Sequence, residues 1–161
     1  MPNFFEERTV KWEKDKVVMI DQLRLPTQFR YVECTNHNQV ADAIKRMVIR
    51  GAPAIGVAAA MALALAGKNS KARNRDDFVN DLDAAAEVIR ATRPTAINLF
   101  WGVNQILKKV QESSTDVETL KEEIVAEANR LADEDVEFNK KIGFYGASLL
   151  EDGDTVLTHC K

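Results

Sequence analysis

The chain has 161 residues, of which 45% are hydrophobic and 29% are charged, with a net charge of −3. This length suits one domain, or one domain and the start of another, and the apolar share is enough for a packed core. The 22 basic residues are balanced by 25 acidic ones, which argues against a nucleic-acid surface. Two distant cysteines, Cys34 and Cys160, favour a reduced cytoplasmic setting, and His37 and His159 form no recognisable metal set.

The first 34 residues are rich in β-forming side chains. Candidate strands cover residues 9–12, 16–20 and 29–34, with a polar turn between the first two. We expect Trp12 and Val18 to pack with Tyr31 on one face of a small antiparallel sheet. The N-terminus lacks the charged and apolar regions of a signal peptide.

Helical patterns follow residue 34. Thr35 or Asn36 can cap a first helix, which Gly51 is placed to end. Its apolar side consists of Val40, Ala43, Ile44, Met47 and Val48. Pro53 then opens a helix that is apolar on all sides as far as about residue 66, where Gly67 is placed to end it. That segment is too short to span a bilayer, so we interpret it as a core helix and expect no membrane partner.

Residues 68–75 form a polar run that we interpret as a solvated linker. A helix that starts at Asp76 or Asp77 should end before Arg93, because the residue before a proline avoids the helical region. Its apolar side consists of Phe78, Leu82, Ala85, Ala86 and Ile89. Thr95 can cap the next helix, which is expected over residues 96–110.

Thr115 and Glu118 have the spacing of a capping box at the start of a long amphipathic run. Its many acidic residues are interpreted as a solvated face rather than as paired catalytic carboxylates. The run can break at Gly143 or Gly146. Residues 155–160 have the pattern of a short buried strand, which needs partner strands and is typical of the opening of a further α/β unit.

The segment from Arg50 to Gly56 is the strongest functional candidate from its residues alone. Arg50 precedes a small-residue turn and Pro53 sets the first helical turn, so that a guanidinium and free backbone N–H groups face one point. That arrangement suits an anion such as a sugar phosphate. The same residues also suit an ordinary tight turn into a buried helix with Arg50 solvated, and both interpretations stay open.

Four stretches in the same order resemble the methylthioribose-1-phosphate isomerase family of the initiation factor 2B-like superfamily. They are DQLRLP at 21–26, IRGAPAIG at 49–56, TRPTAINLFW at 92–101 and GDTVLTHC at 153–160. The form RGAPAIG resembles the methylthioribose enzymes more than their bisphosphate-using or translational relatives. In the family a larger Rossmann-like domain follows the cysteine, so the resemblance implies a truncated chain.

The resemblance implies an α+β fold with a sheet subdomain at 1–34, a helical domain at 35–150 and the start of a truncated Rossmann-like domain at 151–161. It implies an aldose–ketose isomerase of methionine salvage that converts 5-methylthioribose 1-phosphate to 5-methylthioribulose 1-phosphate. It also implies a small sugar phosphate as ligand, no metal or organic cofactor, no nucleic-acid partner, and a homo-oligomer for the full-length family.

By matching position, Arg50, Gly51 and Ala52 would contact the substrate, mainly its phosphate, and Arg93 would be a second cationic contact. Cys160 would be the catalytic thiol, although its type and place also suit a small buried strand residue. The catalytic aspartate of the family falls beyond this chain, so we expect negligible turnover from the chain alone. Two alternatives are a non-catalytic module that binds a sugar phosphate or nucleotide, and an interaction domain whose last strand pairs with another chain.

Overall fold

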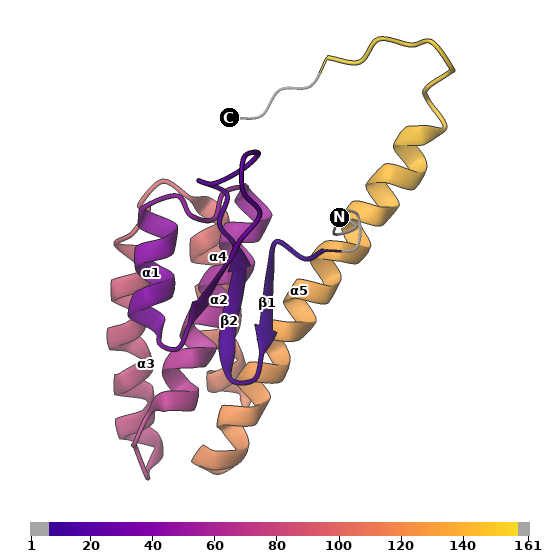
Figure 1. Cartoon of the computed structure of the whole chain (residues 1–161). Coiled ribbons are helices and arrows are strands. Elements are labelled where there is room, and N and C mark those ends of the chain that lie inside the picture. Colours follow the sequence, from indigo (N-terminus) through magenta and orange to yellow (C-terminus); the bar gives the residue numbers. More distant parts are fainter. Residues whose placement is uncertain (1–6, 158–161) are drawn as a thin grey trace.

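The computed structural model describes residues 7–157. A three-stranded antiparallel sheet consists of β1 (Val10–Glu13), β2 (Lys16–Ile20) and β3 (Tyr31–Cys34). The helices are α1 (His37–Lys45), α2 (Ala52–Asn69), α3 (Arg75–Arg90), α4 (Ile97–Glu112) and α5 (Val117–Ala147). The sheet lies against one side of the helices, and the second half of α5 projects beyond them (Figure 1). This architecture confirms the predicted small sheet followed by a helical bundle, while the domain boundaries stay predictions.

The sheet is built in the predicted order, but its faces differ from the prediction. Trp12 pairs with Val17 and Val17 with Cys34, so these three side chains share the face that packs on the helices. Val18 pairs with Lys11, and both lie on the opposite face together with Tyr31. The expectation that Trp12 shares a face with Val18 and Tyr31 is therefore wrong, because side chains alternate along a strand.

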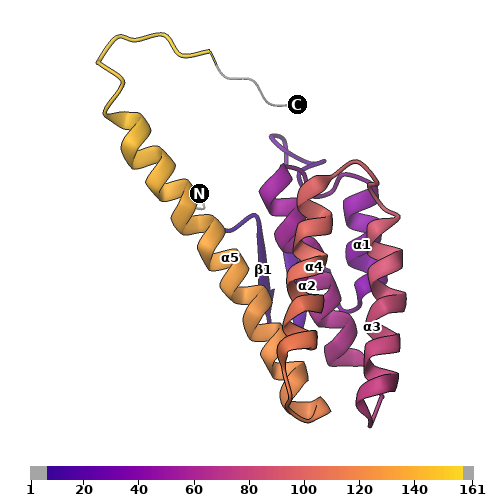
Figure 2. The ribbon, with the colours of Figure 1, turned by 180° about the vertical axis from the view of Figure 1, so that it is seen from behind.

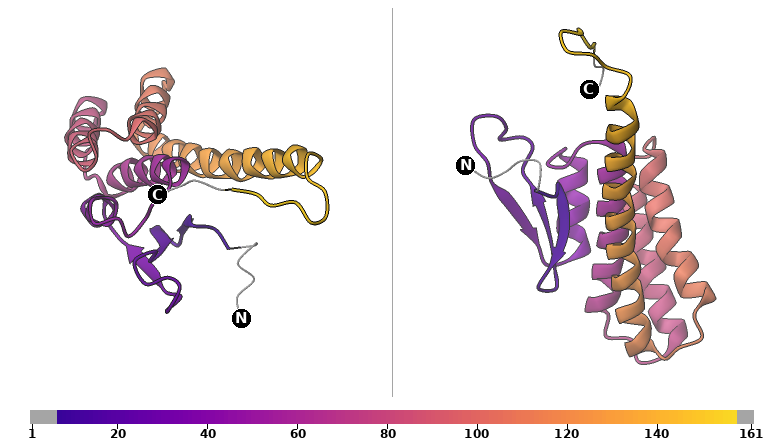
Figure 3. Two further views of the ribbon diagram at one scale, coloured as in Figure 1. Left: turned by 90° about the horizontal axis from the view of Figure 1, so that it is seen from above. Right: turned by 90° about the vertical axis from the view of Figure 1, so that its right-hand side faces the viewer.

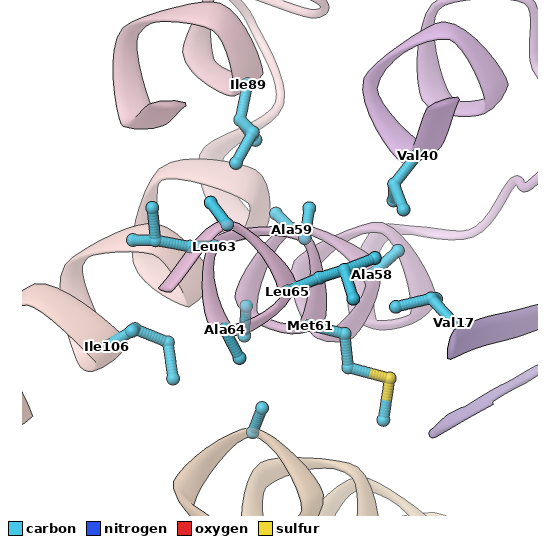
Figure 4. Close-up of a cluster of buried hydrophobic side chains, with 14 of the residues drawn as sticks. Val17, Val40, Ala58, Ala59, Met61, Leu63, Ala64, Leu65, Ile89 and Ile106 are labelled. Atoms are coloured by element: carbon cyan, nitrogen blue, oxygen red, sulfur yellow. The ribbon is translucent and has the colours of Figure 1, made fainter. Parts of the chain in front are cut away.

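Helix α2 forms the centre of the core, as its all-round apolar sequence predicts. It has the length and hydropathy of a membrane-crossing helix, yet 72% of it is buried among the other elements. Figure 4 shows its side chains pointing in several directions, with Leu63 toward Ile106 and Ala58 near Val17. Every residue from Ile55 to Gly67 is buried, and the many alanines let neighbouring elements approach closely.

Two glycines that the sequence assigns to helix ends have other roles. Helix α1 ends at its C-cap Arg46, and Met47 takes the left-handed conformation (φ 60°) four residues before Gly51. Gly67 lies inside α2, which continues to Asn69. A Cβ at Gly67 would lie 2.4 Å from Cδ1 of Ile124, so this glycine allows α5 to approach rather than stopping the helix.

Side-chain caps explain where α3 and α5 begin. Asn74 accepts a 2.9 Å hydrogen bond from the backbone N–H of Asp77, so α3 begins at Arg75 rather than at Asp76 or Asp77. Asp116, not Thr115, caps α5 by accepting bonds from the N–H groups of Glu118 and Thr119. Asn and Asp are among the residue types most favoured at the N-cap position. The predicted helix starts differ slightly from the observed ones because the neighbouring residues are also good caps.

The polar run before α3 is not a free linker throughout. The Arg75 guanidinium donates to the carbonyl oxygens of Val110 and Ser113 at the end of α4, at 2.7 Å for the second bond. These carbonyls lack helical partners of their own, and a cation is favoured beside them. Lys68 belongs to α2 and pairs with Glu122 of α5 at 2.6 Å. The solvated-linker interpretation is wrong for these two residues.

Replacing Asn74 with alanine tests the cap of α3. We expect a loss of about 1 kcal/mol in the free energy of unfolding, because the N–H of Asp77 loses its acceptor. Urea denaturation followed by circular dichroism measures the change. Asn80→Ala is the matched control, because Asn80 is an exposed residue inside the same helix, where alanine is the better helix former. Equal losses in the two variants would contradict the capping role.

The last part of the chain departs most from the prediction. Helix α5 passes through Gly143 and Gly146 without a break and ends at Ala147. Residues 155–157 form no strand, and Leu157 is 96% exposed. Within the described range no strand lies beside this segment to pair with its backbone groups, which a strand requires. The remainder of the predicted strand, residues 158–160, lies outside the described residues.

Candidate functional site

Two helices begin side by side at the end of the bundle where the predicted anion-binding residues lie. A Cβ at Gly56 of α2 would lie 2.7 Å from the carbonyl oxygen of Asn98, in the first turn of α4. A Cβ at Gly102 of α4 would lie 2.1 Å from the carbonyl oxygen of Gly56. Figure 2 shows the two helices running alongside each other. The glycines therefore allow direct backbone contact between the two helices, close to where each begins.

This contact places the two predicted arginines at one end of the bundle. Arg50 lies two residues before α2, and Arg93 lies four residues before α4. Arg50 is exposed and Arg93 is half-buried. Neither guanidinium forms a hydrogen bond or ion pair with any other residue between 7 and 157. Two cationic groups are thus available to an anion at this end, although their roles as substrate contacts stay predictions.

The backbone at this end also has unused donors. Gly51 takes a φ of 95° before α2, Pro53 occupies its first turn, and neither α2 nor α4 has a side-chain cap. Within the described chain, nothing accepts a hydrogen bond from four backbone N–H groups of these first turns: those of Ala52, Ala54, Ile97 and Asn98. Helices α1, α3 and α5, in contrast, are each capped by Asn or Asp. Free N–H groups and the helix dipoles favour a negative group at this point.

The loop between β2 and β3 supports the segment before α2. The N–H of Gln22 donates to the carbonyl oxygen of Val48 at 2.9 Å, and the Gln22 side chain donates to the carbonyl oxygen of Arg50 at 3.3 Å. These bonds link the loop, which includes the DQLRLP stretch, to the turn that contains Arg50 and Gly51. Sequence reasoning singled out this stretch as a motif without assigning it a role, and the structure gives it a positioning role.

One of the two cysteines lies within the described residues. Cys160, the predicted catalytic residue, lies outside the described residues, as does His159. Cys34 is buried at the inner face of the sheet, and burial, followed by the nearby Asp42 carboxylate, raises the pKa of its thiol to about 11. Such a thiol is almost wholly protonated at neutral pH, so Cys34 is a core residue rather than a nucleophile.

Two open cavities lie where α5 leaves the bundle, beside the first turn of α2. One, of about 690 Å³, is lined by Ala54 and Val57 of α2 and by Asp135 of α5. The other, of about 480 Å³, is lined by Pro53, Trp101 and Phe138 among others, and also by Asp135. Burial raises the pKa of the Asp135 carboxyl, partly offset by a hydrogen bond from Asn139.

Asp135 is the one residue here that sequence reasoning missed, because it was grouped with the solvated acids of the amphipathic run. Its half-burial and its place beside the start of α2 make it a candidate acid–base group. No group of three or more metal-binding side chains comes together in residues 7–157. The arrangement can therefore bind an anion at two helix ends with a carboxyl group nearby.

The sequence model of the Initiation factor 2 subunit family matches residues 48–161. Methylthioribose-1-phosphate isomerase of Geotalea uraniireducens is 48% identical over 155 residues, which is 95% of this chain and 44% of that protein. The crystal structure of 5-methylthioribose 1-phosphate isomerase from Pyrococcus horikoshii OT3 superposes with a TM-score of 0.86 at 45% identity, over 91% of this chain and 41% of that one.

A second solved structure is nearly as similar. It is the translation initiation factor eIF-2B, subunit delta, from A. fulgidus, with a TM-score of 0.83 and 43% identity over 91% of this chain and 43% of that one. The chain thus spans less than half the length of each of these relatives. Both structures share this fold at similar identity, so the fold alone does not separate an isomerase from a translational relative.

Proposed function

The chain belongs to the Initiation factor 2 subunit family, and on that premise we propose that it is the amino-terminal portion of an aldose–ketose isomerase. The substrate we propose is 5-methylthioribose 1-phosphate, and the product is 5-methylthioribulose 1-phosphate. The observation that carries the proposal is the pair of uncapped helix ends with Arg50 and Arg93 beside them. The RGAPAIG sequence and the isomerase names of the curated relatives support the methylthioribose substrate.

The phosphate of the substrate would lie at the paired helix ends. Arg50 and Arg93 would balance its charge, and the N–H groups of Ala52 and Ala54 would bind its oxygens. A guanidinium–phosphate bond is stronger than a neutral hydrogen bond and fixes the orientation of the sugar. The part of the reaction that this structure supports is therefore the capture and orientation of the phosphate end.

The chemistry beyond the phosphate needs acid–base groups. Ring opening with the phosphate attached, followed by transfer of hydrogen between C2 and C1, requires one group to remove a proton and another to deliver one. We propose Cys160 as one of these groups, from its position in the GDTVLTHC stretch. A thiol whose pKa is lowered by a neighbouring arginine can act near neutral pH. No metal or organic cofactor is part of the proposed mechanism.

A titration of the whole chain with three ligands tests the proposal. We expect 5-methylthioribose 1-phosphate to bind more tightly than ribose 1-phosphate, and both to bind more tightly than adenosine monophosphate. Isothermal calorimetry measures the three affinities, and a coupled assay of ketose formation measures turnover, for which we expect no detectable rate. Cys160→Ser is the control, because removal of a reacting thiol should leave phosphate binding unchanged within about 3-fold.

Each outcome separates the alternatives. Tighter binding of the nucleotide than of either sugar phosphate would favour a regulatory binding module, to which the 43% identity with the eIF-2B delta subunit structure points. Absence of binding by all three ligands would exclude both candidate functions for this chain. A turnover rate comparable with that of a full-length relative would contradict the expectation that this chain alone is inactive.

A further inference from the structure

The carbonyl oxygen of Arg50 is held from outside the turn that contains it. In a regular helix this oxygen would accept a hydrogen bond from the N–H four residues later, at Ala54. The first such bond of α2 instead runs from the N–H of Ile55 to the carbonyl oxygen of Gly51, at 2.9 Å. Within the described chain, the one donor to the Arg50 oxygen is the side-chain amide of Gln22, at 3.3 Å.

The backbone around Gln22 is itself held by hydrogen bonds. The N–H of Gln22 donates to the carbonyl oxygen of Val48 at 2.9 Å, and the N–H of Asp21 donates to that of Arg30 at 2.9 Å. The right-hand view of Figure 3 shows the loop between β2 and β3 at the end of the molecule where α2 begins. Gln22, which is half-buried, thus holds two carbonyl groups of one turn, those of Val48 and Arg50.

A hydrogen bond to this carbonyl also fixes the N–H on the other side of the same peptide. The peptide between Arg50 and Gly51 is trans, since Leu25–Pro26 is the one cis bond in the part of the chain that the structure describes. In a trans peptide the C=O and N–H groups point in opposite directions. The Gly51 N–H is therefore turned away from Gln22, and no described residue accepts a hydrogen bond from it. Because Gly51 is an exposed residue, this N–H is available to a ligand.

Glycine at this position makes the support from Gln22 necessary. A flip of the peptide would exchange the directions of its C=O and N–H groups, and it would change φ of Gly51 by about 180°. Gly51 has a φ of 95°, and a residue without a Cβ adopts the flipped value about as readily. The flipped peptide would present a carbonyl oxygen, which repels an anion. The amide of Gln22 favours the orientation that presents the N–H.

We propose that Gln22 is a positioning residue for the phosphate: its side-chain amide holds the peptide between Arg50 and Gly51 so that the Gly51 N–H faces the phosphate. This role rests on the proposed function, since the phosphate is that of the proposed substrate. Gln22 does not contact the phosphate and acts through the Arg50 carbonyl. The Gly51 N–H then joins those of Ala52 and Ala54 in binding the phosphate oxygens.

Binding of 5-methylthioribose 1-phosphate to the whole chain at about pH 7.5, where glutamate is ionised, tests this role. Gln22→Ala should weaken binding about 3- to 10-fold, because the loss of one neutral hydrogen bond lets part of the population adopt the flipped peptide. Gln22→Glu should weaken it more than about 30-fold, since a carboxylate repels the Arg50 carbonyl and adds a negative charge near the phosphate.

Gln28→Glu is the matched control. Gln28 is exposed in the same loop, and its side chain forms no hydrogen bond within residues 7–157. Because the substitution adds the same charge without facing a carbonyl, we expect it to change the affinity less than about 3-fold. Circular dichroism checks that all three variants are folded.

Lowering the pH should restore binding in the Gln22→Glu variant. At about pH 4 most copies of the new side chain are protonated and can donate to the Arg50 carbonyl as the amide does. With inorganic sulfate, whose charge does not change in this range, the loss relative to the unchanged chain should fall from more than about 30-fold to less than about 5-fold. Gln22→Ala has no proton to gain and should keep its loss. Comparison at one pH cancels the titration of the carboxylates that both chains share.

The amide resonance of Gly51 reports on the peptide directly. In an isotope-labelled chain, sulfate should shift this resonance in the unchanged protein and move it little in Gln22→Glu at neutral pH. Three results would each overturn the role of Gln22 while the proposed function stands: equal affinities of the unchanged chain and Gln22→Glu, equal losses in Gln22→Glu and Gln28→Glu, or a Gly51 resonance that sulfate does not move. Failure of the unchanged chain to bind 5-methylthioribose 1-phosphate would overturn both.

Discussion

Replacing Gly102 with alanine is expected to lower the free energy of unfolding by about 3 kcal/mol, although alanine is normally the better helix former. The new Cβ would lie 2.1 Å from the carbonyl oxygen and 2.9 Å from the carbonyl carbon of Gly56. These are backbone atoms inside α2, so no side-chain rotation can remove the clash. Either α4 moves away from α2, which opens the core, or the helix bends.

Gly143→Ala is the matched control for this prediction. Gly143 also lies inside a helix, but a Cβ added there would have no atom within 4 Å beyond its own helix. There we expect a gain of up to about 1 kcal/mol from helix propensity alone. Thermal unfolding followed by circular dichroism should show a melting temperature about 10 °C lower for Gly102→Ala, and an unchanged or higher one for Gly143→Ala.

The change in stability of Gly102→Ala shows whether Gly102 is needed for the packing of α4 on α2. If both variants gain stability, α2 and α4 do not approach through their glycines. The close approach of the two helices near their starts, and with it the candidate anion site, would then be contradicted. A loss confined to Gly102→Ala would support the site as well as the packing, because the same contact brings the segments before α2 and α4 to one end of the bundle.

The elements that could be predicted from the sequence are those set by periodicity. The apolar face of α3 is confirmed, since Phe78, Leu82 and Ile89 are all fully buried. The three strands and the buried α2 are confirmed for the same reason: alternation or an uninterrupted apolar run requires little knowledge of the partner element. Local chemistry also indicated that Pro53 opens α2.

The elements that could not be predicted depend on a distant part of the chain. A glycine in an apolar helix can be a stop or a point of close approach, and only the position of Ile124 shows that Gly67 is the second. Arg75 ends a polar run that resembles a linker, and only the position of the end of α4 shows that it binds carbonyl groups there. The predicted strand at 155–160 has a strand-like sequence, but its described part has no neighbour to pair with.

The candidate site also has features that the sequence predicts and features that depend on distant contacts. The motifs placed Arg50 and Arg93 each before a helix, which the structure confirms. That the two helices start side by side depends on Gly56 and Gly102, whose contact no local pattern reveals. Asp135 was missed because nothing in the sequence separates it from the other carboxylates of an acidic helix. Its position at a cavity is visible only in the structure. The role of Cys160 stays a prediction.

Removing the two arginines singly and together is expected to show that they bind one anion. Each of Arg50→Ala and Arg93→Ala should weaken binding of a ribose 1-phosphate by about 10- to 150-fold, because a hydrogen bond to a charged group contributes about 1.5–3 kcal/mol. Neither side chain has a partner within residues 7–157, so the substitutions should leave the free energy of unfolding nearly unchanged. Calorimetric titration at fixed salt gives the affinities, and urea denaturation gives the stabilities.

The double variant tests whether both arginines bind the same anion. Two groups that contact the same phosphate reorganise together, so their effects should depart from additivity by at least about 0.5 kcal/mol, whereas independent sites add. Arg46→Ala is the control, because Arg46 is an exposed arginine at the end of α1 whose partner is Asp42, and it should leave binding unchanged. Strictly additive losses would mean that the two arginines act independently and do not share one phosphate group. Unchanged affinity in both single variants would contradict the proposal that these two arginines bind the phosphate of the substrate.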